Sequence, residues 1–586
     1  MTFPTKKLLL SLCFLPFAWS VSAQQIADEV APEAAIALKA KESREPVNAK
    51  DWMVAVANPV AASAAAAVLD GGGNAIDAAI AAQAMLGLVE PQSSGLGGGA
   101  FLVYLDGETG TVTTLDGREE APSAATPKLF QDDQGEPLKF FDAVVGGRSV
   151  GVPGTPALLE EMHKRWGKTA WPDLLQPAID RARAGFTVSD RLAGLVGSGV
   201  EHLSKHPETK AYFLPGDKPV VAGTTLRNEP YANVLEAMAS EGASFFYSGQ
   251  LASDIVATIQ GFESNPGVMS VDDLAKYKVI EREAVCGPYR VYSVCGMGPP
   301  SSGALTVGQI LGLLQPYDLA AMGADDPQSW RLIGDASRLA FADRGRYMAD
   351  SDFIKVPARG LLKADYVKAR SMLLGGSMAL ETVEPGEPEW DETRFWADDE
   401  SIELPSTTHF SIVDGDGNAV SMTSTIENGF GSRLMTNGFL LNNELTDFSF
   451  RDQKDGKPIA NRVEPGKRPR SSMAPTIVLK DGEPVLIIGS PGGSRIIGYV
   501  AQTIIAHLDW DMDIQKAISS PHLVNRFGKF DVEKETEAEA LIPALEAMGY
   551  EVTVRNLTSG LHGIAITADG LQGGADHRRE GIVLGR

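Results

Sequence analysis

The sequence changes character abruptly before Thr407. Residues 381–403 carry ten Asp and Glu side chains, several prolines and little hydrophobic periodicity, which predicts a solvated linker. From Thr407 the pattern is strongly β: residues 407–413 and 419–426 alternate in polarity, with the turn-forming letters DGDGN between them. We therefore expect a β-hairpin that begins directly where an acidic connector ends.

The rest of the chain alternates between groups of helices and groups of strands. Asn58-Pro59 and Asn74 are typical of helix starts, because Asn accepts from free N–H groups and Pro suits the first turn. Such grouping fits a layered α/β sandwich. The sequence predicts strands at 52–57, 100–105, 111–115, 476–479 and 484–488, and helices at 59–70, 74–88, 326–349, 498–506 and over much of 155–285.

The first 23 residues have the pattern of a secretory leader. Lys6 and Lys7 precede an apolar stretch at 8–19, and Val21-Ser22-Ala23 offers small residues for cleavage before Gln24. The stretch is short for a membrane span, and no later run of 18 apolar residues follows. We expect an exported protein, periplasmic or secreted, without a membrane span; the alternative is a buried N-terminal helix.

Charge and cysteine content exclude several classes of partner. The net charge of −24 repels phosphate groups, so neither nucleic acid nor an anionic membrane surface is an expected partner. Outside the leader only Cys286 and Cys295 remain, a spacing that suits a disulfide across a hairpin in an exported protein, although two separate buried thiols are the alternative. Two cysteines without a nearby histidine argue against zinc, and we expect neither metal nor cofactor.

Thr407 becomes chemically special if the chain is cut in front of it. A terminal threonine carries a nucleophilic hydroxyl and, in its own α-amine with a pKa of about 8, the base that accepts the proton. On these letters alone, Thr407 could equally be an ordinary strand threonine. The surrounding motifs decide between the two readings.

Ordered motifs along the whole chain resemble the γ-glutamyltranspeptidase family. Before the linker these motifs are PQSSGLGGG at 91–99, DGRE at 116–119, PPSSG at 299–303 and AFADR at 340–344. After it they are TTHFSIVD at 407–414, TSTI at 423–426, LNNELTDF at 441–448, KRPRSSM at 467–473, GSPGGSRI at 489–496 and GADHR at 574–578. Each motif is weak alone, but this many in one order is specific.

The resemblance implies a fold and a maturation step. The fold would be the four-layer αββα sandwich of N-terminal-nucleophile hydrolases. The chain would cut itself between Ser406 and Thr407, so that residues 24–406 become a large subunit and 407–586 a small subunit, held together as a heterodimer. Thr407 would then be the nucleophile.

The resemblance also assigns a pocket for a γ-glutamyl group, which carries an α-carboxylate and an α-ammonium. Arg118, Ser471 and Ser472 match the carboxylate-binding residues, because guanidinium and hydroxyl groups donate to a carboxylate. Glu444 and Asp447 match the ammonium-binding residues, and Glu427 stands where many relatives carry Asn and adds a third carboxylate. The alternatives are a surface salt bridge for Arg118 and a solvated turn for the two acids.

Two further parts of the machinery are assigned by resemblance. Gly492 and Gly493 match the oxyanion hole, where small residues let backbone N–H groups approach the developing negative charge; a plain turn or a phosphate loop is the alternative. Thr425 matches the residue that orients the nucleophile's hydroxyl. The segment 449–470 is shorter than in those family members that place an aromatic side chain over the bound glutamyl group, and it lacks tyrosine, which predicts a more open pocket.

The expected function is that of a glutathione hydrolase and γ-glutamyltransferase. A γ-glutamyl ester at Thr407 would be resolved by water or by an amino-acid or peptide acceptor. Two alternatives remain: a β-lactam (glutaryl cephalosporin) acylase on the same fold, whose substrate lacks the ammonium, and a binding relative without catalysis, whose chain would stay uncut.

Overall fold

A computed structural model of the continuous chain describes residues 39–390, 396–399, 401, 403 and 406–586. The predicted leader at 1–23 lies outside these residues. No helix in the described part of the chain is both long and apolar enough to cross a membrane.

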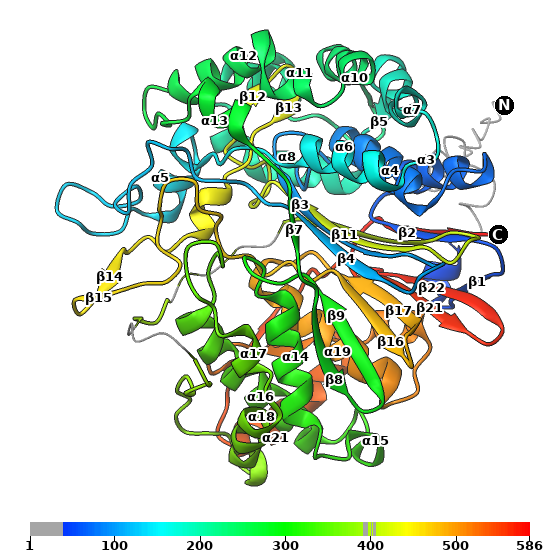
Figure 1. The fold of residues 1–586 in the computed structure, drawn as a ribbon, viewed down its shortest axis with the longest axis vertical. Coiled ribbons are helices and arrows are strands. Elements are labelled where there is room, and N and C mark those ends of the chain that lie inside the picture. The colour runs from blue at the N-terminus through cyan, green and yellow to red at the C-terminus, as the bar shows by residue number, and fades with distance from the viewer. Residues whose placement is uncertain (1–38, 391–395, 400, 402, 404–405) are drawn as a thin grey trace, which may run out of the picture.

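Two seven-stranded sheets stack face to face between two layers of helices (Figure 1). The first sheet has the order β23-β2-β10-β11-β3-β4-β7 and the second β1-β22-β21-β17-β16-β9-β8. Residues from both inner faces, among them Met53, Val103, Ile477 and Ile564, form one buried cluster between the sheets. The predicted αββα sandwich is thus confirmed.

The strands of the two sheets have the following bounds. The first sheet consists of β2 (Met53–Val56), β3 (Gly99–Leu105), β4 (Val112–Gly117), β7 (Ile280–Arg282), β10 (Thr408–Val413), β11 (Ala419–Thr425) and β23 (Ile582–Gly585). The second consists of β1 (Val47–Ala49), β8 (Val285–Tyr289), β9 (Tyr292–Gly296), β16 (Thr476–Lys480), β17 (Glu483–Gly489), β21 (His562–Thr567) and β22 (Gly570–Ala575). Short strands outside the sandwich include β14 (Gln453–Lys454), β15 (Lys457–Pro458), β18 (Leu523–Asn525), β19 (Lys529–Glu533) and β20 (Glu551–Arg555).

Each sheet has its own helical cover. Over the first sheet lie α3 (Pro59–Asp70), α4 (Ala75–Val89), α6 (Thr155–Trp166), α7 (Trp171–Ala184), α8 (Asp190–Leu203), α10 (Glu229–Glu241) and α12 (Gly249–Gln260). Over the second lie α14 (Gly303–Leu314), α16 (Pro327–Tyr347), α18 (Ala364–Ser371), α19 (Ile496–Leu508), α20 (Ile514–Ser519) and α21 (Ile542–Ala547). The two covers bury separate hydrophobic clusters against the outer faces of the sheets.

The helix starts follow the predicted capping. The Asn58 side chain accepts from the N–H of Val60 at the start of α3, and Asn74 forms a reciprocal capping box with Asp77 at the start of α4. Both helices pack on the central strands of the first sheet, since α3 contacts β2 and α4 contacts β10 and β11. The local signals therefore fix two helices directly behind the hairpin that begins at Thr407.

The predicted hairpin is confirmed and lies at the centre of its sheet. Strands β10 and β11 pair antiparallel, with Thr408 opposite Ser424, and they are flanked by β2 and β3. Every residue of both strands is buried. Because both faces are covered, the start of β10 and the end of β11 meet inside the molecule.

The expectation of a solvated linker is wrong for the part closest to Thr407. Glu381, Glu384, Glu387 and Glu389 are exposed, but Asp399 and Glu403 are each only 7 % exposed. Each of the two buried carboxylates pairs with an arginine, Asp399 with Arg470 and Glu403 with Arg344. Composition predicts solvation on average and says nothing of such specific partners.

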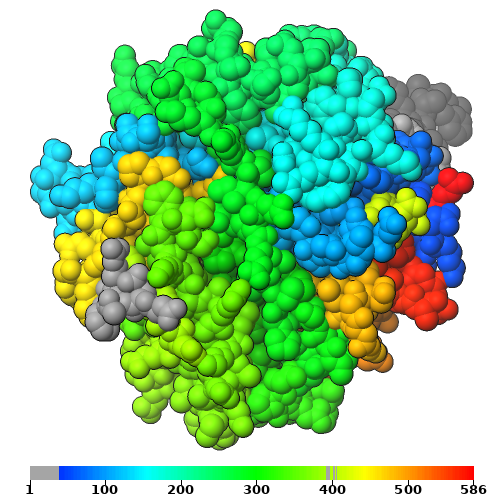
Figure 2. Space-filling view, viewed as in Figure 1, coloured from blue at the N-terminus to red at the C-terminus, as the bar shows by residue number. Residues whose placement is uncertain are grey.

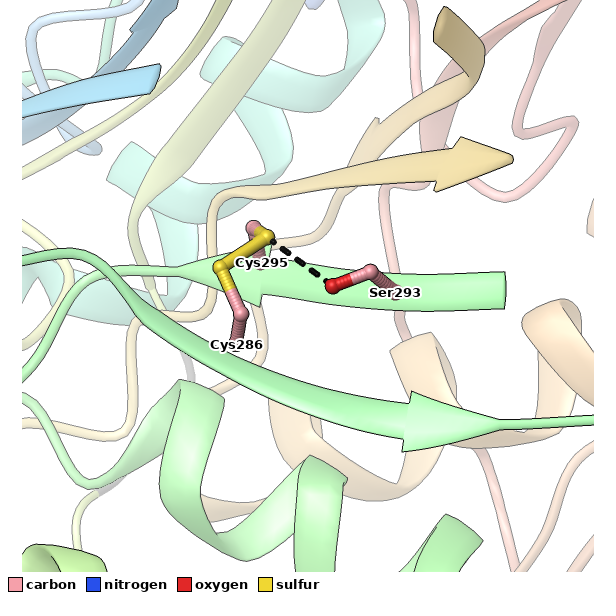
Figure 3. Close-up of a disulfide and its surroundings, with 3 residues drawn as sticks. All are labelled: Cys286, Ser293 and Cys295. Carbon is pink, nitrogen blue, oxygen red and sulfur yellow. Dashed lines mark hydrogen bonds between the residues drawn. A yellow bond between two sulfur atoms is a disulfide. The ribbon is translucent and has the colours of Figure 1, made fainter. Parts of the chain in front are cut away.

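A disulfide joins the adjacent antiparallel strands β8 and β9. Cys286 lies opposite Cys295 in the register of the two strands, and the structure bonds their sulfur atoms (Figure 3). The disulfide links the edge strand β8 of the second sheet to its neighbour β9. The hairpin of Thr407 belongs to the other sheet.

Candidate active site

The hydroxyl of Thr407 lies next to that of Thr425. Thr407 comes just before β10 and Thr425 ends β11, and their Oγ1 atoms are 3.0 Å apart. The N–H of Glu427 donates to Thr425 Oγ1 over 2.8 Å, which leaves the proton of Thr425 available for Thr407 Oγ1. Thr425 is thus placed where it could orient the Thr407 hydroxyl, as the resemblance implies.

The main chain around Thr407 is held in an unusual conformation. Thr407 has a φ of +80°, a region that β-branched residues avoid, and such a conformation costs about 1–3 kcal/mol. Arg579 donates to the carbonyl of Thr407 over 3.0 Å, and Ser406 Oγ donates to the carbonyl of Gln92 over 3.0 Å. The surrounding structure thus holds strain at the residue that follows the predicted scissile bond.

The predicted oxyanion glycines lie in the connection between β17 and α19. Gly492 has a φ of +141° and Gly493 a φ of +60°, both in the region that favours glycine. A Cβ atom on Gly492 would come within 2.7 Å of the Tyr499 ring. Gly493 lines the same small pocket as Thr407 and Thr425. The backbone at Gly493 therefore reaches the pocket of Thr407.

Arg118 pairs with both predicted ammonium-binding acids. Its guanidinium bonds Glu444, and its Nη2 lies 2.6 Å from Asp447 Oδ2. Arg118 is fully buried, and it also donates to the carbonyls of Pro469 and Arg470. The structure brings together the residues to which the resemblance gave opposite substrate charges.

One oxygen on each acid remains available. Within the described residues, Glu444 Oε2 and Asp447 Oδ1 are buried without a hydrogen-bond partner. Burial raises the pKa of Glu444 well above its ordinary value, and Arg118 only partly opposes this shift. Burial, reinforced by the nearby Glu403, likewise raises the pKa of Asp447. A bound ammonium would satisfy both oxygens and stabilise their charged forms.

Glu119, next to Arg118 in the chain, adds to this acidic cluster. Burial raises the pKa of Glu119 to about 8, with Arg118 acting in the opposite direction. Neither carboxylate oxygen of Glu119 has a hydrogen-bond partner among the described residues. The sequence interpretation did not assign this residue to the site, although it lies within the DGRE motif.

The remaining predicted residues surround the same pocket. Glu427 is buried, has a φ of +71° and accepts from Asn443. Ser471 Oγ accepts from the N–H of Met473 over 3.1 Å, and Ser472 Oγ accepts from Arg344 Nη2 over 2.7 Å. Glu427 and Ser471 line the pocket together with Thr407.

Besides Glu119, three charged residues of the site escaped the sequence interpretation. Arg344, from α16, donates to Ser302 and Ser472 and pairs with Glu403. Arg470 is fully buried beside them and pairs with Asp399 over 3.0 Å. Arg344 and Arg470 belong to the AFADR and KRPRSSM motifs, so the motifs could have indicated them. No local feature of the sequence indicates that Glu403 lies beside these two arginines.

The pocket beside Thr407 is nearly closed. Its volume is about 20 Å³, room for about one water molecule. None of the residues that line it comes from 449–470. That segment instead carries the β14–β15 hairpin, which lies at the molecular surface (yellow in Figures 1 and 2) near the cyan residues before α5 (Phe140–Val144). The segment therefore forms no lid over this pocket, but the pocket of the continuous chain is not the more open one that the sequence predicts.

Comparison of the sequence with known proteins shows the family to which the chain is similar. The family model for Gamma-glutamyltranspeptidase matches residues 61–585. The chain is 37% identical to the glutathione hydrolase proenzyme of Bacillus subtilis (strain 168) over 548 residues, 92% of both chains. It is also 37% identical to the glutathione hydrolase proenzyme of Escherichia coli (strain K12) over 549 residues, 91% of both chains.

A solved structure of an acylase has a similar fold. The cephalosporin acylase from Bacillus halodurans superposes with a TM-score of 0.82 at 27% identity, and the match covers 92% of this chain and 97% of that one. The sequence matches extend over nearly the whole chain and include the hairpin, the paired glycines and the acidic cluster described above. The chain therefore belongs to the γ-glutamyltranspeptidase family.

Proposed function

We propose that this protein is a glutathione hydrolase and γ-glutamyltransferase that matures by cutting itself before Thr407. One observation carries the proposal: the Thr407 hydroxyl lies 3.0 Å from that of Thr425, in a pocket that holds Arg118, Glu444 and Asp447. A nucleophile beside buried groups of both charge signs suits an acyl donor that is a zwitterion. Its substrates are glutathione and other γ-glutamyl compounds.

Maturation uses the same hydroxyl as catalysis. Thr407 Oγ1 attacks the carbonyl carbon of Ser406, the peptide C–N bond breaks, and the proton of the hydroxyl passes to the nitrogen, which becomes the new α-amine. Water then hydrolyses the ester between Ser406 and Thr407, which leaves a carboxylate on Ser406 and restores the hydroxyl. The strained φ of Thr407 favours this step, because cleavage releases the constraint on its backbone.

Catalysis then proceeds in two displacements. The α-amine of Thr407 takes the proton of the hydroxyl, whose oxygen attacks the γ-carbonyl carbon of the donor. The N–H groups at Gly492 and Gly493 stabilise the oxyanion, and the leaving amine takes up the proton. Water or the amine of an amino acid or peptide attacks the resulting ester, releases the γ-glutamyl group and frees Thr407.

Selectivity follows from the charges of the pocket. The donor's ammonium satisfies Glu444 Oε2 and Asp447 Oδ1, which have no other partner among the described residues. Glu427 adds negative charge on the same side, and Ser471 and Ser472 supply hydroxyl groups for the carboxylate. An acyl group without an ammonium leaves buried charge unpaired, which costs binding energy.

Three further features belong to the proposal. Residues 24–406 and 407–586 form a heterodimer of large and small subunits. The protein is exported to the periplasm or beyond, as its leader-like first residues suggest. It works without a cofactor, because the nucleophile, the base and the oxyanion donors all come from the chain.

Acylase activity on a glutaryl-type substrate is the second candidate, favoured by the similarity to the cephalosporin acylase fold. Such a substrate has no ammonium for Glu444 and Asp447. Turnover of a γ-glutamyl-anilide and a glutaryl-anilide by the same preparation separates the two. Glutaryl-anilide turned over at the higher kcat/KM would overturn the γ-glutamyl assignment.

The maturation step is tested on a gel with N-terminal sequencing. Wild-type protein is expected to give two fragments, one of which starts at Thr407. Thr407→Ala is expected to stay whole and inactive. Thr408→Val serves as the matched control, because the Thr408 hydroxyl is buried without a hydrogen-bond partner among the described residues. An uncut Thr408→Val, or an active and uncut wild type, would refute the scheme.

A further inference from the structure

Glu403 reaches from the linker into the pocket of Thr407. Its side chain lines that pocket together with Arg118, Asp447 and Ser471, although Glu403 precedes Thr407 by only a short connection. The carboxylate pairs with Arg344, and the N–H of Ser494 donates to the Glu403 carbonyl over 3.4 Å. Both the side chain and the main chain of this residue are therefore fixed across the site before cleavage.

The groups around the Glu403 carboxylate form an anion-binding site. Arg344 donates to Ser472 Oγ over 2.7 Å and bonds Glu403 with the same Nη2 atom. Arg470 Nε lies 4.0 Å from Glu403 Oε1. Two arginines and a serine hydroxyl thus meet at one carboxylate, an arrangement that suits a carboxylate ligand.

Arg470 has unused capacity to donate. Its side chain is fully buried, yet Nε and Nη1 have no hydrogen-bond partner among the described residues. Its Nη2 is occupied by Asp399 and Ser401. The main chain holds the Glu403 carboxylate at a distance from Arg470. A free anion that came closer would satisfy the unused donors of this buried guanidinium and would therefore be favoured.

Glu403, Glu444 and Asp447 line one small pocket, so a single ligand with an anionic and a cationic group could meet both the arginines and the acids. Glu403 is close enough to Asp447 to raise the pKa of that acid, and Arg118 adds to the positive charge around Glu403. A ligand whose carboxylate replaces that of Glu403 would bring its α-ammonium toward Asp447 Oδ1 and Glu444 Oε2, the two unpartnered oxygens. Arg118 is already bonded to both acids. Arg470 still has two donor atoms without a partner among the described residues, so it is a second cation for the ligand's carboxylate.

We propose that Arg344 and Arg470 are specificity-determining residues for the donor's α-carboxylate, and that Glu403 occupies their site as an internal carboxylate until the chain is cut. The inference rests on the proposed function and adds to it. Cleavage turns Glu403 from a tethered ligand into the fourth residue from a free carboxyl end. Its effective concentration at the site then falls, and a free α-amino acid group can replace it.

Binding of L-glutamate to uncut protein tests this directly. Full-length Thr407→Ala is compared with Thr407→Ala/Glu403→Ala by isothermal titration calorimetry. Removal of the tethered carboxylate is expected to lower the Kd for L-glutamate at least about tenfold, because an internal competitor is lost. Thr407→Ala/Glu381→Ala is the matched control, since Glu381 is an exposed acid of the same linker, and its Kd should equal that of Thr407→Ala.

A second ligand separates site occupancy from general opening of the pocket. L-isoglutamine has an amide in place of the α-carboxylate and should gain no affinity from Glu403→Ala. An equal gain for both ligands, or a Kd for L-glutamate that stays within about twofold, would overturn the inference.

A failure of this inference can be distinguished from a failure of the proposed activity. Wild-type turnover of a γ-glutamyl-anilide is measured in parallel. Turnover without the change in Kd refutes the role of Glu403 alone. The change in Kd without turnover supports the carboxylate site and refutes the enzymatic proposal.

Discussion

Single hydroxyl groups and charges decide the chemistry of this site. Thr425 is the one side chain that the structure hydrogen-bonds to Thr407 Oγ1 within the described residues, and its own position is set by the N–H of Glu427. Nearby, the buried pair of Glu444 and Asp447 with Arg118 fixes the balance of charge in the pocket. Both features can be removed by changes of a few atoms.

Thr425→Val removes only the hydroxyl and keeps the shape of the side chain. We expect kcat to fall by about 100-fold, because the nucleophile loses the group that orients it. Thr425→Ser, which restores the hydroxyl, should recover most of the rate. The rates are measured with a γ-glutamyl-anilide on cleaved protein. A Thr425→Val enzyme with wild-type kcat would show that Thr425 plays no part in positioning Thr407.

His562, at the start of β21, provides a test of pH dependence. Burial lowers its pKa from 6.5 to about 3, and both ring nitrogens lack a hydrogen-bond partner among the described residues. Because the folded pKa lies below the unfolded one, the stability that this group contributes is present above about pH 6.5 and is lost as the pH falls toward 3.

We therefore expect His562→Gln to be less stable than wild type at pH 7.5, owing to lost packing, and to close that gap in acid. The gap should shrink by about 1.4 kcal/mol per pH unit below 6.5, since the variant has no group to protonate. Urea unfolding at pH 7.5, 6 and 5 measures it. A difference in unfolding free energy that does not vary with pH contradicts the expectation.

At the scale of elements, the site depends on close contact between β11 and the glycines before β3. Thr425 lies opposite Gly99 in the register of the two strands. A Cβ atom on Gly98 would come within 2.0 Å of the Thr425 carbonyl oxygen, and one on Gly97 within 2.1 Å of the Leu440 carbonyl oxygen. The glycines of the GLGGG motif thus allow close packing of backbones and are not there to make the chain flexible.

Gly98→Ala should push the end of β11 away and displace Thr425. We expect both the melting temperature and kcat to fall, because the clash is with backbone atoms that cannot rotate aside. Gly194→Ala is the control: Gly194 lies inside α8, and a Cβ atom there meets nothing within 4 Å. That change should be neutral or stabilise the helix by up to about 1 kcal/mol. Equal effects of the two substitutions would disprove the packing role of Gly98.

At the scale of the whole molecule, the two proposed subunits are interleaved strand by strand. Strands β10 and β11 lie between β2 and β3, and the run β22-β21-β17-β16 lies between β1 and β9. Each boundary between strands from before and after the cut is therefore a row of backbone hydrogen bonds within a sheet. The fragments cannot separate without unfolding both sheets.

Cleaved protein should consequently elute from gel filtration as one particle containing both fragments, in low salt and in 1 M salt, a concentration at which exposed charges are screened within about 3 Å. The fragments should part only in denaturant, and activity should be lost over the same range of urea. Fragments that separate in salt alone, or activity in an isolated fragment, would contradict the interleaved arrangement.

The sequence by itself determined the elements and singled out Thr407 as the proposed nucleophile. Capping at Asn58 and Asn74, the alternation on both sides of residues 414–418 and the ordered motifs depend on neighbours in the chain, so periodicity and local hydrogen bonding reveal them. The ordered motifs also predicted that Thr407, Thr425, Gly493 and the charged residues Arg118, Glu444 and Asp447 belong to one site.

Only the tertiary structure decided how the charges are shared. Arg118 pairs with acids more than 300 positions away, Glu403 leaves a linker that looked solvated, and Arg344 and Arg470 surround its carboxylate. The free energy of a buried charge depends on which opposite charges and hydrogen-bond donors the fold brings within a few ångströms. The composition of a segment contains no information about these partners. A stretch of chain can therefore be acidic enough to predict exposure and still bury two carboxylates, those of Asp399 and Glu403, that pair with arginines.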